Sequence, residues 1–254
     1  MRVLFAGAGA AEVLSAGEVR ALAAFAAALY VESPAGVAAL IAPGVQAGPI
    51  HAGLDGRPPR AAAGDAVAVE LAGMRPWTGW LPEPAALRAA TPLVLEVLTP
   101  LAERSAVPEL RASAALAALD GHDLPSVAAA VGGAGPGLTP AGDDALAGLL
   151  LALRALGGNP QVDLARVVAT TAISAAFLSW AARGQSLQCV HDLLTAAAAE
   201  DAGATHSAAR VLGAVGHTSG CDIALGICWG FGHASTSSQA VHRKGSVPPN
   251  LTRR

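Results

Sequence analysis

Short apolar runs occupy the start of the chain, whereas in the rest the apolar residues recur with the period of an α-helix. The runs ALYVES (28–33), GVAALIAP (36–43) and DAVAVELAG (65–73) are β-branched or alternate with polar residues, and turns rich in proline and glycine separate them. Such runs predict strands. After about Pro82, apolar residues recur at helical spacing or fill whole segments, which predicts amphipathic and buried helices.

The predicted helices account for most of the chain. The sequence therefore predicts an α+β protein, in which a small β-rich N-terminal part is followed by a mainly α-helical body. We divide it into a β-rich region (1–82), a helical domain (83–232) and a polar tail (233–254) that we expect to be disordered. The predicted helical segments are 83–105, 109–121, 142–158, 163–184, 187–201, 205–215 and 221–231.

The apolar composition raises the question of a membrane protein. Hydrophobic residues make up 53% of the 254 residues and charged residues 14%. The longest strongly apolar run without a charged residue, Val167 to Ala182, has 16 residues, fewer than the roughly 18 to 20 that a spanning helix needs. Nothing after Arg2 has the arrangement of an export signal. We therefore expect a cytoplasmic protein that does not enter the membrane.

Charge and cysteine content argue against other classes. The net charge of −3 gives no long-range attraction to nucleic acid. Cys189, Cys221 and Cys228 form no CxxC pair and no even set, so neither a structural zinc nor disulfides are indicated. Alanine-rich helices invite self-association without specifying it, which leaves a homo-oligomer open.

The first residues resemble the start of a dinucleotide-binding unit. A predicted strand runs into Gly7 and Gly9, and Glu32 follows about twenty residues later, where such a unit has its ribose-binding acid. A doubly wound domain would continue with a helix and a strand, but further strands separated only by turns follow here. We therefore interpret this stretch as a first strand and a turn of small residues.

Two glycine-rich stretches, each leading into a predicted helix, repeat one pattern. Both contain glycine, threonine, glycine and then an aspartate that is followed four residues later by a third glycine. Glycine within a helix costs roughly 1 kcal/mol relative to alanine, so Gly148 and Gly226 suggest close approach of another backbone. We expect the two helices to cross there and to bring their N-terminal loops together. The two stretches are GLTPAGDDALAG (137–148) and GHTSGCDIALG (216–226).

These loops suit a small ligand with an anionic end and an amino end. Free N–H groups at helix starts bind phosphate or carboxylate, and the aspartates can accept hydrogen bonds from an amide. Thr171 and Ser174 fall on one face of a predicted helix, so their hydroxyls can face the same site. Capped, closely packed helices with hydroxyls bonded to their own backbone remain the alternative.

In combination, three segments resemble a bacterial family named after AllH, a subunit of oxamate carbamoyltransferase. They are GPGLTPAGDDALAG, TTAISAAFLSWAARG and GHTSGCDIALG, and together they span roughly residues 133–230. Ala141 departs from the serine expected in the family's Thr-Pro-Ser-Gly-Asp-Asp, which removes one hydroxyl.

The resemblance implies carbamoyl transfer in allantoin breakdown, between oxalurate plus phosphate and oxamate plus carbamoyl phosphate, together with other subunits, including one of the FdrA type. On this basis we expect Asp144 and Asp222 to orient an amide nitrogen and His217 to stabilise charge on the carbamoyl oxygen. No cofactor is implied, although magnesium stays a candidate. The residues expected to bind substrate are Gly135, Gly137, Thr139, Gly142, Asp143, Thr171, Ser174, Thr218, Ser219 and Gly220.

Two other interpretations stay open. The chain could be a non-catalytic scaffold subunit whose paired loops serve docking. It could also be a metal-dependent hydrolase in which Asp143, Asp144, Asp222 and His217 hold a hard ion such as magnesium or manganese, although their spacing matches no known metal motif. A pocket that gathers these side chains would favour an enzyme, and scattered side chains would favour the scaffold.

Overall fold

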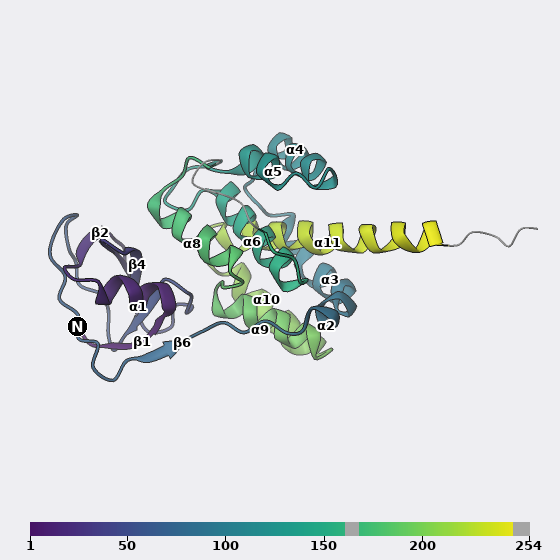
Figure 1. Ribbon diagram of the computed structural model, residues 1–254. Helices are drawn as coiled ribbons and strands as arrows, with labels where there is room; N and C mark the ends of the chain where they lie inside the picture. Colours follow the sequence, from purple (N-terminus) through teal and green to yellow (C-terminus); the bar gives the residue numbers. More distant parts are fainter. Residues whose placement is uncertain (161–167, 246–254) are drawn as a thin grey trace, which may run out of the picture.

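The computed structural model describes residues 1–160 and 168–245 and confirms the α+β class. A small sheet with one helix lies on one side of the molecule, and the helical body lies on the other (Figure 1). Within the described residues the sheet has six strands in the order β2-β3-β4-β5-β1-β6. The strands are β1 (Val3–Gly7), β2 (Arg20–Ala24), β3 (Ala28–Ser33), β4 (Gly36–Ile41), β5 (His51–Leu54) and β6 (Arg75–Trp77).

The sheet is mixed. The pairs β1/β5, β2/β3 and β3/β4 are antiparallel, whereas β4/β5 and β1/β6 are parallel. Helix α1 (Ala8–Ser15) follows β1 directly and buries Val13 and Leu14 in a core shared with the sheet. The sequence predicted only a turn here, because eight residues rich in alanine and glycine carry little amphipathic signal.

Gly7 and Gly9 have packing reasons that do not involve a nucleotide. A Cβ at Gly7 would lie 2.3 Å from the carbonyl oxygen of Gly48, and a Cβ at Gly9 would lie 2.4 Å from Nε1 of Trp180. Only glycine lets these segments approach so closely. Together with the mixed sheet, these contacts support the interpretation of the opening stretch as a strand and a close-packed turn.

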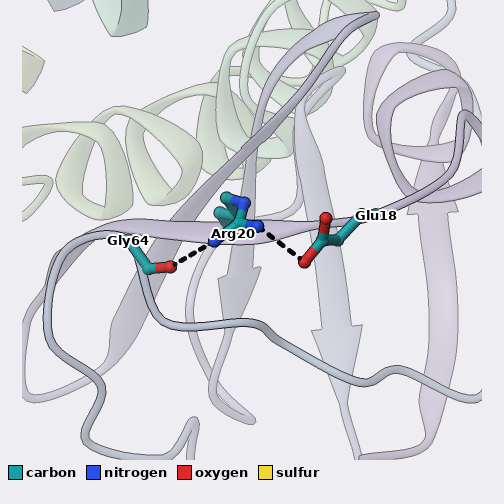
Figure 2. Close-up of polar contacts among 3 residues, drawn as sticks. All are labelled: Glu18, Arg20 and Gly64. Atoms are coloured by element: carbon teal, nitrogen blue, oxygen red, sulfur yellow. Dashed lines mark hydrogen bonds and ion pairs between the residues drawn. The ribbon is translucent and has the colours of Figure 1, made fainter.

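The predicted strand at 65–73 is wrong. This segment runs along the sheet and makes two isolated bridges, Arg2 to Glu70 and Arg20 to Ala66, without forming a ladder. Figure 2 shows how the segment is attached: the Arg20 guanidinium donates to the Gly64 carbonyl at 3.0 Å and pairs with the Glu18 carboxylate at 2.9 Å. Its alternating pattern reflects the packing of Val67, Val69 and Leu71 against the core of the sheet.

The helical body is built around two crossing helices, α6 (Ala141–Ala155) and α11 (Ser219–Gly245). In Figure 1, α11 is the long yellow helix, and its C-terminal end points away from the sheet. No helix in the described residues is both long and apolar enough to cross a membrane. The other helices are α2 (Pro84–Ala89), α3 (Thr91–Ala102), α4 (Glu109–Asp120), α5 (Leu124–Val131), α8 (Ala172–Ala182), α9 (Gln188–Ala198) and α10 (Ala202–Gly213).

Four helical segments differ from those predicted. The sequence did not predict α5, and the run 83–105 forms two helices because Pro84 and Pro92 each start one. In the run 163–184 the helix begins only at Ala172, and residues 163–167 lie outside the described residues. Helix α11 continues to Gly245, into the tail expected to be disordered, and residues 246–254 lie outside the described residues.

Specific contacts join the sheet to the helical body. The Trp77 indole N–H donates to the Gln188 side chain at 2.5 Å, and the Gln185 amide makes two hydrogen bonds with the backbone of Gly79, both at 2.9 Å. Helix α8 packs against β4. These contacts hold the strand-rich part over the N-terminal ends of α6 and α11.

Candidate functional site

The two glycine-rich stretches form matching loop-and-helix units. A Cβ at Gly142 would lie 1.8 Å from the carbonyl oxygen of Val131 in α5, and a Cβ at Gly220 would lie 1.8 Å from that of Leu212 in α10. Each glycine N–H also donates to the loop before it, at 2.8 Å for Gly142 and 3.1 Å for Gly220. The units α5–α6 and α10–α11 are therefore an internal repeat, and these two N–H groups are occupied by the protein itself.

The prediction that two helices cross at Gly148 and Gly226 is confirmed. A Cβ at Gly148 would lie 2.2 Å from the carbonyl oxygen of Ile223, and a Cβ at Gly226 would lie 1.8 Å from that of Ala145. Each glycine thus meets the carbonyl three residues before the other. This reciprocity relates α6 and α11 by an approximate two-fold axis through the crossing, which makes Asp144 and Asp222 equivalent positions.

A cavity of about 550 Å³ lies between the sheet and the helical body, at the N-terminal ends of α6 and α11. Much of its wall is apolar, with Ile41, Phe177 and Leu187 among the contributors. No arginine or lysine lines it among the described residues. The polar side chains that line it are Tyr30, Gln46, His51, Thr139, Asp144, Gln185, Ser186 and Ser219.

Asp144 is the acid of this cavity. Its side chain is buried, with the residue 8% exposed, and within the described part of the chain its Oδ2 has no hydrogen-bond partner. Burial, and to a lesser extent the negative charges of Asp222 and Asp143, raises the pKa of Asp144 to about 8 even though hydrogen bonding from the Ser219 and Thr139 hydroxyls lowers it. At neutral pH the carboxyl is therefore mostly protonated, and it can both donate and accept hydrogen bonds.

Two cavity residues come from the sheet and were not predicted. Tyr30 of β3 lines the cavity, and burial together with the charge of Asp144 raises the pKa of its hydroxyl. His51 of β5 is 6% exposed, and burial lowers its pKa to about 4. Its Nδ1 lies 2.8 Å from the Gln46 carbonyl oxygen, so this nitrogen carries the proton and Nε2 is left as an acceptor.

Asp222, although equivalent to Asp144, serves the protein's own backbone. It is fully buried, and its Oδ1 accepts hydrogen bonds from the Ser105 hydroxyl at 2.6 Å and the Ala106 N–H at 2.7 Å. It does not line the cavity. The segment between α3 and α4 thus occupies Oδ1 of Asp222, and its buried Oδ2 has no hydrogen-bond partner among the described residues. The counterpart Asp144 faces the cavity.

Asp143 is likewise a structural acid. Its Oδ1 accepts from the Gly133 N–H at 2.7 Å, and its Oδ2 accepts a short hydrogen bond from the Thr170 hydroxyl. The residue is 2% exposed. It therefore fixes the loop before α6 to the segment before α8 and does not line the cavity.

The predicted hydroxyl pair also positions this loop. Thr171 caps α8 by accepting from the Ser174 N–H at 3.1 Å, and its hydroxyl donates to the Leu138 carbonyl at 2.5 Å. The Ser174 hydroxyl donates to the same carbonyl at 3.4 Å. Both side chains lie outside the cavity wall and hold the backbone next to Thr139, which lines it.

The remaining predicted residues are scattered. His217 is exposed and does not line the cavity, and Thr218 does not line it either. Gly135 and Gly137 are exposed and have φ angles of +115° and +99°, which suit glycine in a turn. Of all the residues expected to form the site, the structure brings together Thr139, Asp144 and Ser219 in the cavity.

The geometry gives no support to a metal-dependent hydrolase. No group of three or more histidine, cysteine, aspartate or glutamate side chains in the described ranges could hold a metal ion. Asp143 and Asp222 already accept hydrogen bonds from the protein, and His217 is exposed. The donor set proposed from the sequence therefore does not fit magnesium or manganese.

Comparison with known proteins identifies one family. The sequence model of the family described as "Oxamate carbamoyltransferase subunit AllH" matches residues 131–231. This segment contains both crossing helices, α6 and the start of α11, as well as α8, α9 and α10. No curated protein and no solved structure matches the chain.

Proposed function

We propose that the chain is a subunit of an oxamate carbamoyltransferase and that its cavity binds the amide end of the substrate, because residues 131–231 match the AllH family model. The family description names a subunit, which implies partner chains. We include among them a subunit of the FdrA type. The observation that carries the proposal is that Asp144, whose buried Oδ2 has no partner among the described residues, lines the cavity.

The carboxyl of Asp144 is chemically complementary to a primary amide. A protonated carboxyl donates one hydrogen bond and accepts another, and an amide offers the matching carbonyl and N–H. Burial in an apolar wall strengthens such a neutral pair and disfavours a charged one. Tyr30, Ser219 and Thr139 add hydroxyls that can donate or accept around it.

The internal repeat supports this assignment. Asp222, the equivalent acid, receives one O–H and one N–H donor from the protein itself. Asp144 occupies the corresponding place but faces the cavity, so a ligand with N–H groups would complete its hydrogen bonding in the same way. Oxamate, oxalurate and carbamoyl phosphate all carry such a group.

The reaction we assign to the assembled enzyme transfers a carbamoyl group. In the direction of oxalurate breakdown, a phosphate oxygen attacks the ureido carbonyl carbon, the bond from that carbon to the oxamate nitrogen breaks, and the nitrogen takes up a proton. Asp144 would orient the amide and hold a proton at its carboxyl oxygen close to that nitrogen. Within this chain, the cavity wall would exclude water, which would otherwise hydrolyse the carbamoyl product.

Activity of the assembled enzyme tests the proposal. We expect Asp144→Leu, which keeps a side chain of similar length but removes both polar atoms, to lower carbamoyl phosphate formation from oxalurate and phosphate by about 100-fold or more. Asp55→Asn, at an exposed aspartate of the sheet, is the control and should leave the rate unchanged. Retention of wild-type activity by a folded Asp144→Leu enzyme would refute the role of the cavity.

A non-catalytic role in assembly is the second candidate. It is favoured by the use of Asp143, Asp222, Thr171 and Ser174 in holding loops together. In that case Asp144→Leu would leave the activity of the complex unchanged, whereas loop variants would reduce the yield of the complex.

A further inference from the structure

Among the described residues, the cavity has an acid but no arginine or lysine to bind an anion, although each substrate of the proposed reaction has an anionic group. The acid is Asp144. Asp222 and Asp143 lie close enough for their negative charges to raise the pKa of Asp144. The electrostatic environment therefore opposes a phosphate or carboxylate deep in the cavity.

The backbone does not supply the missing positive charge where the sequence predicted it. The N–H groups of Gly142 and Gly220 donate to carbonyl oxygens of their own loops, and those of Asp143 and Asp222 donate to the carbonyls of Pro140 and Thr218. Asp222 and Asp143 also lie in the first turns of α11 and α6, where they offset the positive ends of the helix dipoles. The protein's own carbonyls and aspartates thus largely offset the positive ends of these two helices.

The cavity opens where exposed apolar residues gather. Val211 of α10 lines the cavity and is 42% exposed. Three further lining residues are also exposed: Gly44, which follows β4 of the sheet, and Ala214 and Gly216, which follow α10 of the helical body. Phe25, which is 54% exposed, stacks edge-on against the cavity residue Tyr30 at 6.0 Å. This rim, formed by Phe25, Gly44, Val211, Ala214 and Gly216, is apolar and uncharged.

We infer that this rim docks a partner subunit, which inserts an arginine or lysine over the cavity and so completes the site for the anionic end of the substrate. The inference rests on the proposed function, because the family description implies partner chains. Charge complementarity selects the partner, because the carboxyls of Asp143, Asp144 and Asp222 attract a cation to the cavity. That cation can then pair with the phosphate or carboxylate of the ligand. This chain alone holds the amide end, and the complex holds both ends.

The test measures oxamate binding to this chain alone and to the complex purified from cells that co-express the partner subunits. Equilibrium dialysis with labelled oxamate should give an affinity at least about tenfold higher for the complex, because one additional charge pair is worth that much. Val211→Arg places a cation on the rim, and we expect it to raise the affinity of the isolated chain about tenfold.

Leu116→Arg provides the matched control. Leu116 lies in α4, does not line the cavity and is 41% exposed, nearly the same as Val211. The control should not change oxamate binding. In the complex, Val211→Glu should weaken both partner association and oxamate binding, and Leu116→Glu should affect neither. Ala214→Arg serves as a second rim variant if Val211→Arg does not fold.

The outcomes separate this inference from the proposed function. Oxamate or phosphate binding to the isolated wild-type chain as tight as to the complex would overturn the inference even if the complex is a carbamoyltransferase. Rim variants with no effect on binding would overturn it as well. A complex that forms no carbamoyl phosphate would refute the proposed function, whereas gain of oxamate binding by Val211→Arg would still support the incomplete site.

Discussion

At the scale of single residues, Asp144 stands apart from the other two acids at the crossing. Asp143 accepts hydrogen bonds at both carboxylate oxygens, whereas Asp144 and Asp222 each keep a buried Oδ2 with no partner among the described residues. Of the three acids, Asp144 alone lines the cavity. An unpaired buried polar group lowers the stability of the fold. Such a cost is expected at a binding site, where the ligand supplies the missing hydrogen bonds.

Asp144 should therefore make folding depend on pH. Its pKa in the folded protein is about 8, against an ordinary value of 3.8. The folded state binds the Asp144 proton more tightly than the unfolded state does. The stabilisation from this proton is therefore complete below pH 4 and is lost as the pH rises to about 8, by up to ~1.4 kcal/mol of unfolding free energy per pH unit. We expect Asp144→Asn, which lacks this proton, to gain stability relative to wild type over that range.

Urea unfolding of both proteins between pH 5 and 9 checks this expectation. The difference in unfolding free energy should grow up to about pH 8 and then level off. A difference that stays constant with pH would mean that Asp144 is ionised in the folded protein and that the neutral carboxyl assigned to it is wrong.

At the scale of elements, the crossing of α6 and α11 determines where the site lies. Their backbones approach so closely that Gly148 and Gly226 each face a carbonyl of the other helix. The repeated glycine pattern was sufficient to predict this crossing from the sequence, because glycine within a helix has a cost that close packing explains. The sequence did not reveal the partners of the aspartates, since Ser105, Ala106 and Gly133 carry no distinguishing pattern.

Substitutions at the crossing should be costly. Gly148→Ala and Gly226→Ala would bring a Cβ within 2.2 Å and 1.8 Å of a carbonyl oxygen, so the helices must separate. We expect each to lower the free energy of unfolding by about 1–3 kcal/mol or more. Because both affect one contact, the double variant should lose less than the sum.

Gly232→Ala in the same helix is the matched control. A Cβ there would meet nothing within 4 Å, so the change should be neutral or stabilising by up to about 1 kcal/mol. Chemical denaturation of the four variants provides the measurement. Equal effects at Gly226 and Gly232 would contradict the close crossing.

At the scale of the whole molecule, the cavity exists because the sheet covers the N-terminal ends of α6 and α11. Thr139, Asp144 and Ser219 belong to the repeated motifs and could be predicted as site residues. Tyr30 and His51 lie in the sheet more than 80 residues earlier, and no local pattern in their strands distinguishes them from ordinary strand residues. Only tertiary packing brings them to the site.

His217 lies apart from the cavity at this scale. Its position between Gly216 and Thr218 made it a candidate for catalysis, but the loop directs this part of the chain outward and His217 is exposed. Residue type and motif position therefore predicted Thr139, Asp144 and Ser219, which line the cavity, together with residues that do not line it. The buried histidine of the cavity is His51, held by the Gln46 carbonyl.

The most direct test of the central claim is a crystal structure of the assembled enzyme with oxamate bound. We predict that the oxamate amide lies in the cavity within hydrogen-bond distance of the Asp144 carboxyl, and that its carboxylate points toward the rim at Val211 and contacts a basic residue of a partner subunit. Oxamate bound at another place, with Asp144 making no contact to it, would contradict the account.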